Sequence, residues 1–200
     1  MINRDRVAAG ATGATIAAVA GVVALVAIGL FFSLGQPFGT LNDLALLVMT
    51  VSLVPVMLAH YELGGIVPLW PARLSLVGSA LAVAGWAIVQ TAMILGVVRF
   101  DYERAASGAF AVFSVLQVVI GLWIAGASLL AGSWLPAMTR WLGIVAGLGT
   151  VVMSIGLLLG GVNHVLTYVG GVGYQVLLPV WAFFLGRVFR RTAATAEGAG

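Results

Sequence analysis

WLGIVAGLGTVVMSIGLLLGGVNHVLTYVGGVGYQVLLPVWAFFLG, residues 141–186, contains no Asp, Glu, Lys or Arg. A helix needs roughly 20 apolar residues to cross a hydrocarbon core about 30 Å thick. This stretch is long enough for two crossings, and residues 160–163 (Gly-Gly-Val-Asn) supply a turn between them. It therefore predicts two membrane-spanning helices and indicates that the solvent of the fold is lipid.

Four further stretches without charged residues extend this pattern: residues 7–42, 44–61, 74–98 and 105–139. Each is long enough for one span. The predicted fold is all-α, a single domain over residues 1–191 that forms a six-helix transmembrane bundle, followed by a disordered cytoplasmic tail over residues 192–200. The predicted spans are about 8–33, 41–60, 73–98, 106–131, 139–160 and 164–186.

Composition excludes most soluble classes and several chemistries. The 200 residues are 62% hydrophobic and 8% charged, whereas soluble domains are about 25% charged. The chain has no cysteine and no lysine, which excludes disulfides, thiolate chemistry and a lysine Schiff base. The two histidines, His60 and His164, fall at opposite ends of the predicted bundle and cannot bind one haem iron. We therefore predict no metal site and no cofactor.

The distribution of arginines predicts the orientation of the chain. With the N-terminus inside the cell, seven of the nine arginines face the cytoplasm, as the positive-inside rule requires. These are Arg4, Arg6, Arg73, Arg140, Arg187, Arg190 and Arg191. We expect a multi-pass protein of a bacterial-type inner (plasma) membrane with both termini cytoplasmic. The expected partners are the lipid bilayer and either other membrane subunits or further copies of the chain, but not nucleic acid.

Small residues and prolines indicate how the spans pack. Residues 143–147 (Gly-Ile-Val-Ala-Gly) form a GxxxG motif, which lets two helix backbones approach closely, either within the bundle or between two chains. Pro55 and Pro179 each remove a helix hydrogen bond. We therefore predict kinks in the second and sixth spans.

Polar residues inside spans are the main functional clue, because burying them in lipid is costly. Gln90, Gln117 and Gln175 lie roughly 12–17 Å from the outer ends of their helices, at 1.5 Å per residue, and are predicted to meet at one level. His164, Tyr168 and Gln175 share one helix face. The predicted ligand path comprises Asp43, Gln90, Gln117, His164, Tyr168 and Gln175. The alternative is that the glutamines only join helices, at about 0.6 kcal/mol each.

One pair of segments resembles a protease family. Residues 105–110 (Ala-Ala-Ser-Gly-Ala-Phe) open the fourth predicted span, and Asn163-His164 opens the sixth, both at the outer end. This arrangement resembles that of the rhomboid intramembrane proteases, which use a serine in a Gly-x-Ser-Gly context on the fourth span and a histidine on the sixth. The resemblance implies Ser107 as nucleophile and His164 as its base.

A second resemblance covers more of the chain. The segments 36–43 (Gln-Pro-Phe-Gly-Thr-Leu-Asn-Asp), 134–136 (Trp-Leu-Pro) and 140–147 (Arg-Trp-Leu-Gly-Ile-Val-Ala-Gly) resemble uncharacterised six-helix bacterial integral membrane proteins. That family has no agreed activity, so the resemblance implies an architecture and no site. We predict a non-enzymatic accessory or structural subunit, or a binder of a small apolar or neutral ligand. The alternatives are a minimal rhomboid-like serine protease and a small-solute carrier or channel.

Overall fold

The structure, a computed structural model, describes residues 3–64, 69–98 and 108–195. Across these ranges the chain is helical, with short turns and no β-strand. Six segments are long and apolar enough to cross a membrane: Arg4–Leu34, Phe38–Leu63, Trp70–Ile94, Gly108–Leu130, Ala137–Asn163 and Val165–Thr195. The prediction of an all-α chain with six long apolar helices is confirmed.

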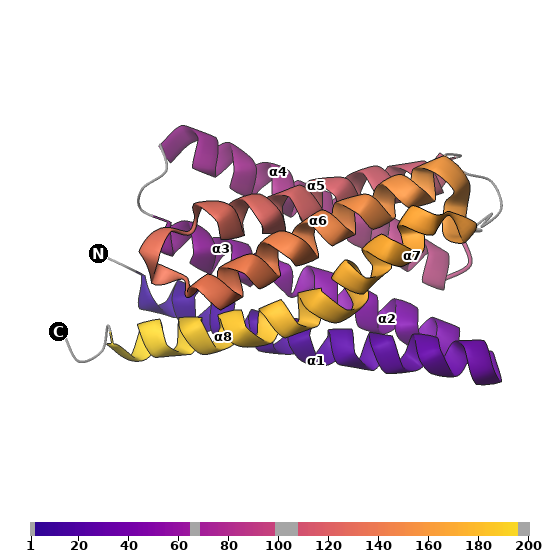
Figure 1. The fold of residues 1–200 in the computed structure, drawn as a ribbon, viewed down its shortest axis with the longest axis horizontal. Coiled ribbons are helices and arrows are strands. Elements are labelled where there is room, and N and C mark those ends of the chain that lie inside the picture. Colours follow the sequence, from indigo (N-terminus) through magenta and orange to yellow (C-terminus); the bar gives the residue numbers. More distant parts are fainter. Residues whose placement is uncertain (1–2, 65–68, 99–107, 196–200) are drawn as a thin grey trace.

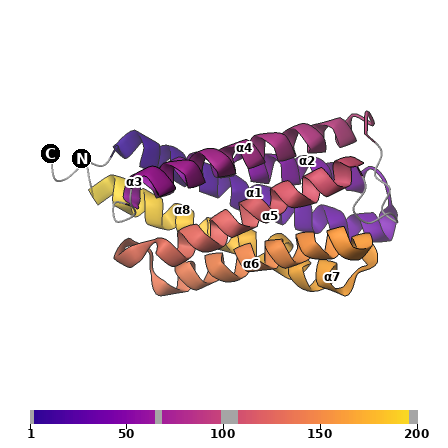
Figure 2. The ribbon, with the colours of Figure 1, turned by 90° about the horizontal axis from the view of Figure 1, so that it is seen from above.

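The six long segments lie side by side along one axis and alternate in direction (Figure 1). The helices are α1 (Arg4–Leu34), α2 (Phe38–Val51), α3 (Leu53–Leu63), α4 (Leu69–Ile94), α5 (Gly108–Leu130), η1 (Gly132–Trp134), α6 (Ala137–Gly160), η2 (Gly161–Asn163), α7 (Val165–Val172), η3 (Gly173–Leu177) and α8 (Leu178–Thr195). Each segment packs against the next, and α8 packs back against α1. The six segments therefore form a closed ring. Figure 2 shows the same helices after a 90° turn about the long axis of the bundle.

Both predicted kinks are present. The second long segment breaks at Ser52, between α2 and α3, one turn before Pro55. The sixth passes through the π-helix η3 just before Pro179. Each break lies where proline removes a backbone N–H donor from the helix ladder. Helix α1 packs directly on both sites, because a Cβ at Gly13 would lie 2.5 Å from Pro55 Cγ and a Cβ at Gly21 would meet the Pro179 ring.

The GxxxG motif packs inside the molecule. Gly143 and Gly147 are both buried on α6. A Cβ at Gly147 would lie 2.5 Å from the Gly121 carbonyl oxygen and 2.5 Å from the Ala125 backbone nitrogen, both on α5. The motif therefore brings the backbones of α5 and α6 into close contact.

One end of the ring carries both chain termini and most of the described arginines, and we call it the arginine end (Figure 1). Arg73 and Arg140 lie near the starts of α4 and α6, which begin there. Arg6 Nη1 pairs with Glu62 Oε2 at 3.1 Å and so ties the start of α1 to the end of α3. Arg99 and Arg104 lie outside the described residues.

Several predicted boundaries shift. Helix α4 begins at Leu69 and ends at Ile94, earlier than the predicted span 73–98. Helix α8 continues to Thr195, so the prediction of a disordered tail is wrong for residues 192–195. Alanines at 193 and 194 favour helix, and Thr192 Oγ1 donates to the Val188 carbonyl at 3.1 Å. Residues 196–200 lie outside the described part.

Candidate functional site

The polar residues of the predicted path do not form one chain of contacts. Gln90 on α4 is 2% exposed, and its Nε2 donates to the Asp43 backbone carbonyl at 3.5 Å. Asn42 Nδ2 donates to Asp43 Oδ1 at 3.4 Å. Asp43 is therefore held by two amide side chains near the end of the ring opposite the arginines.

Gln117 lies beside another part of the second long segment, near Thr50 on α2. It is 2% exposed on α5, and together with Thr50 it lies next to the Tyr174 hydroxyl. Thr50 follows Asp43 on α2 by seven residues, or roughly 10 Å of helix. Gln90, beside Asp43, and Gln117, near Thr50, therefore lie at different depths in the bundle. Within the described ranges, Gln117 Oε1 and the Tyr174 hydroxyl complete no hydrogen bond.

Tyr168 does not face the interior as predicted, because it is 62% exposed. Gln175 is half-buried and lines a groove between α1 and the sixth segment, and its Oε1 is buried without a hydrogen-bond partner among the described residues. Glycine packing explains the position of Tyr168. A Cβ at Gly170 would lie 2.5 Å from the Gly149 carbonyl oxygen, and Gly173 also packs against Gly149. The glycines hold this helix against α6 and leave Tyr168 on the outer side, so the prediction is wrong for Tyr168.

His164 serves as a helix cap. It precedes α7, and its Nδ1 accepts a hydrogen bond from the Leu166 backbone N–H at 3.2 Å. Capping the first turn in this way satisfies a backbone donor that has no partner within the helix. Ser107, the partner that the rhomboid resemblance implies, lies outside the described residues.

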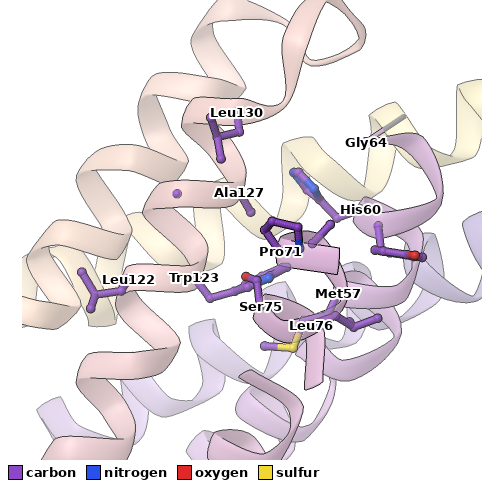
Figure 3. Close-up of a pocket in the computed structure, with 13 residues that line it drawn as sticks. Met57, His60, Gly64, Pro71, Ser75, Leu76, Leu122, Trp123, Ala127 and Leu130 are labelled. Carbon is purple, nitrogen blue, oxygen red and sulfur yellow. The ribbon is translucent and has the colours of Figure 1, made fainter. Parts of the chain in front are cut away.

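Three polar side chains line an unfilled space at the arginine end. A pocket of about 300 Å³ lies between α3, α4 and α5, where Figure 3 shows His60 and Trp123 on facing helices. Its lining is mainly apolar and includes Met57, Leu76, Trp123, Ala127 and Leu130, with His60, Tyr61 and Ser75 as the polar members. Membrane helices pack closely where small residues allow it, but here three helices leave a hollow.

His60 forms the wall of this pocket that faces the molecule's interior. It is 7% exposed, and its ring packs edge-on against Trp134, with centroids 4.8 Å apart, and against Trp123 at 5.9 Å. Trp134 in turn stacks on Phe189 at 6.0 Å. His60 Nε2 is buried without a hydrogen-bond partner in the part of the chain that the structure describes. Buried polar atoms are normally paired, so His60 Nε2 is an exception, enclosed by its neighbours.

The turn between α5 and α6 holds Trp134 in place. Arg140 Nη2 donates to the carbonyl oxygens of Gly132 and Leu135 on either side of it. Trp134 therefore points inward onto His60. Trp70 and Trp141, at 68% and 63% exposed, lie outward near the same end.

From the sequence, His60 is considered only as a haem ligand, and that role is rejected; the structure places it in the wall of the pocket. His60 and His164 do lie at opposite ends of the ring, as predicted. The signal that points to His60 is an ionisable residue inside an apolar span, which marks a functional position by default. Its neighbours from α5 and η1 are far away in sequence and could not be read from the residues around it.

Comparison of the chain with protein-family models, curated proteins and solved structures finds no match.

Proposed function

We propose that this chain is a multi-pass protein of the inner membrane with both termini in the cytoplasm. The distribution of side chains supports this. Large apolar residues are exposed on the outer faces, among them Val19 (61%), Leu81 (66%) and Leu122 (54%), while Thr150 and Ser154 are fully buried. Such an inverted surface suits lipid as solvent, and the arginine end suits the cytoplasmic side.

Cysteine labelling tests this topology cleanly, because the chain has no cysteine of its own. We expect Asn163→Cys, at the end opposite the arginines, to react with a membrane-impermeant maleimide in intact cells. Thr195→Cys, at the arginine end, should react only after lysis. Labelling of both variants in intact cells, or of neither, would contradict the proposed orientation.

We further propose that the protein is a non-enzymatic binder of a small, mainly apolar molecule, held in the pocket between α3, α4 and α5. The observation that carries this proposal is an unfilled, mainly apolar volume of about 300 Å³ whose lining includes the polar residues His60, Tyr61 and Ser75. Ligand pockets are typically apolar, about 300–1,000 Å³ in volume, and carry a few polar groups that orient the ligand. A ligand in the pocket lies against the His60 ring, and the hydroxyl groups of Tyr61 and Ser75 are the polar groups that orient it.

Filling the pocket from Gly126 should abolish binding. A Cβ at Gly126, which lines the pocket, meets no atom within 4 Å, so Gly126→Leu occupies the space without displacing a neighbour. We expect the wild type, purified in a mild detergent, to retain small molecules that organic extraction and mass spectrometry detect. Gly126→Leu should lose them.

Gly78→Leu is the matched control. Gly78 lies exposed on α4, and its Cβ position is also open to 4 Å. Gly78→Leu therefore adds the same side chain to a helix without touching the pocket and should retain the wild-type molecules. Equal retention by the Gly126 and Gly78 variants would refute binding in this pocket.

A further inference from the structure

The mouth of the pocket carries an arginine with unused binding capacity. Arg73 follows the lining residues Pro71 and Ala72 on α4, and its side chain is exposed. Its Nε donates to the hydroxyl of Tyr61, another lining residue, at 3.3 Å. Among the described residues no carboxylate pairs with Arg73, so both terminal nitrogens remain available.

Glu62, the acid beside Tyr61 in the chain, is already paired with other groups. Glu62 follows Tyr61 in the chain, but its Oε2 pairs with Arg6 Nη1 at 3.1 Å, and its Oε1 accepts from the Asn3 backbone N–H at 2.9 Å. Glu62 therefore does not neutralise Arg73. The pocket combines an apolar interior with an uncompensated cation at its mouth.

We propose that the ligand of this pocket is an anionic lipid, with an acyl chain between α3, α4 and α5 and an acidic head group on Arg73. The proposal rests on the binding function proposed above and adds the head-group chemistry. Guanidinium binds carboxylate and phosphate through two parallel hydrogen bonds. Basic sites between membrane helices on the cytoplasmic side bind acidic lipid head groups in the same way. The Tyr61 hydroxyl, which accepts from Arg73 Nε, keeps its own hydrogen to donate to the bound head group.

A pair of ligands with one tail and two head groups tests the proposal. Binding of a long-chain fatty acid and of the fatty alcohol of equal length is measured by native mass spectrometry of the purified protein. We expect the acid to bind wild type about tenfold more tightly than the alcohol, the size of one charge-assisted hydrogen bond. Arg73→Gln should remove that advantage and leave alcohol binding unchanged. Arg73→Lys, which keeps the charge without the two-pronged geometry, should lie between them.

Arg191→Gln is the matched control. Arg191 is exposed at the arginine end, on α8, which contributes no lining residue to the pocket. The Arg191→Gln variant removes the same charge and should leave the affinities for the acid and for the alcohol unchanged. Retained alcohol binding by Arg73→Gln also shows that this variant is folded. Equal affinities of wild type for acid and alcohol, or equal effects of the two arginine variants, would overturn the proposal.

Two further arms separate the remaining questions. Phosphatidylglycerol, which is acidic, and phosphatidylcholine, which is zwitterionic, are titrated beside the fatty acid. Arg73-dependent binding of the fatty acid or of phosphatidylglycerol supports the proposal and shows whether the acidic group is a carboxylate or a phosphate. Phosphatidylcholine binding as tightly as phosphatidylglycerol, together with equal binding of acid and alcohol, would overturn it. Gly126→Leu should lose acid and alcohol alike. If Gly126→Leu retains both ligands, the proposal that they bind in this pocket fails. If it loses both but wild type shows no preference for the acid, the pocket stands and only the proposal of an anionic lipid fails.

Discussion

Gly170→Ala should lower the free energy of unfolding by about 3 kcal/mol, the upper part of the usual cost of overpacking. The added methyl group would meet the Met153 backbone nitrogen and would lie 2.5 Å from the Gly149 carbonyl oxygen and 2.6 Å from Met153 Cα. These are backbone atoms of α6, which cannot rotate away as a side chain does. The two helices must separate to admit the methyl group.

Gly171→Ala provides a control one residue away. A Cβ there meets nothing within 4 Å, and alanine favours helix over glycine by up to about 1 kcal/mol. This variant should therefore match or exceed the wild type. Unfolding is followed by far-UV circular dichroism as sodium dodecyl sulfate is added to mild-detergent micelles. Similar losses of stability in both variants would contradict the close contact of α6 and α7.

Trp86→Ala should cost about 3 kcal/mol, the lower part of the range for truncating a buried aromatic residue. Trp86 is 0% exposed on α4, and its ring lies 5.0 Å from the ring of Phe113 on α5. Its Nε1 has no hydrogen-bond partner within the described ranges, so the loss is one of packing. The unfolded state also stays in an apolar solvent, which leaves mainly lost dispersion contacts and the cavity to set the cost.

Trp141→Ala is the same change at an outward position. Trp141 is 63% exposed, and surface substitutions usually change stability by less than about 0.5 kcal/mol. The same unfolding titration should separate the two variants clearly. A larger loss for Trp141→Ala than for Trp86→Ala would contradict the assignment of inner and outer faces.

The number of long helices could be predicted from the sequence because charges mark where each apolar run stops. Charges do not mark where the helix itself stops. The charge-free run that ends at Val98 predicted a span to that residue, but α4 ends at Ile94, shortly before Gly96, whose φ is +70°. At the other extreme, Arg187 and Arg190 predicted the end of a span, but the backbone continues as helix to Thr195. Arginine is a good helix former, so the charge boundary and the helix boundary separate.

The candidate site was harder to predict because a pocket depends on what is missing between helices. Gly126 lies in an ordinary apolar run, and nothing in that run indicates that its neighbours on α3 and α4 leave space beside it. The predicted polar path assumed ideal helix spacing along the sixth span. The glycine contacts at Gly170 and Gly173 set which face of this helix packs on α6, and they leave Tyr168 on the outer side. Partner choice between helices is set by the whole bundle and is not encoded in one helix.

The packing of α1 against α8 links the beginning of synthesis to its end. Gly21 meets Pro179, Arg190 Nη1 donates to Thr15 Oγ1 at 2.8 Å, and Gly186 lies near Ala14. Domains generally assemble from the N-terminus as the chain is made, but here the first helix has part of its contact surface supplied by the last. While the intervening helices insert, the small-residue face of α1 has only α2 and α3 as neighbours. The ring closes only when the final helix leaves the ribosome, so any chain that stops short of α8 remains an open arc.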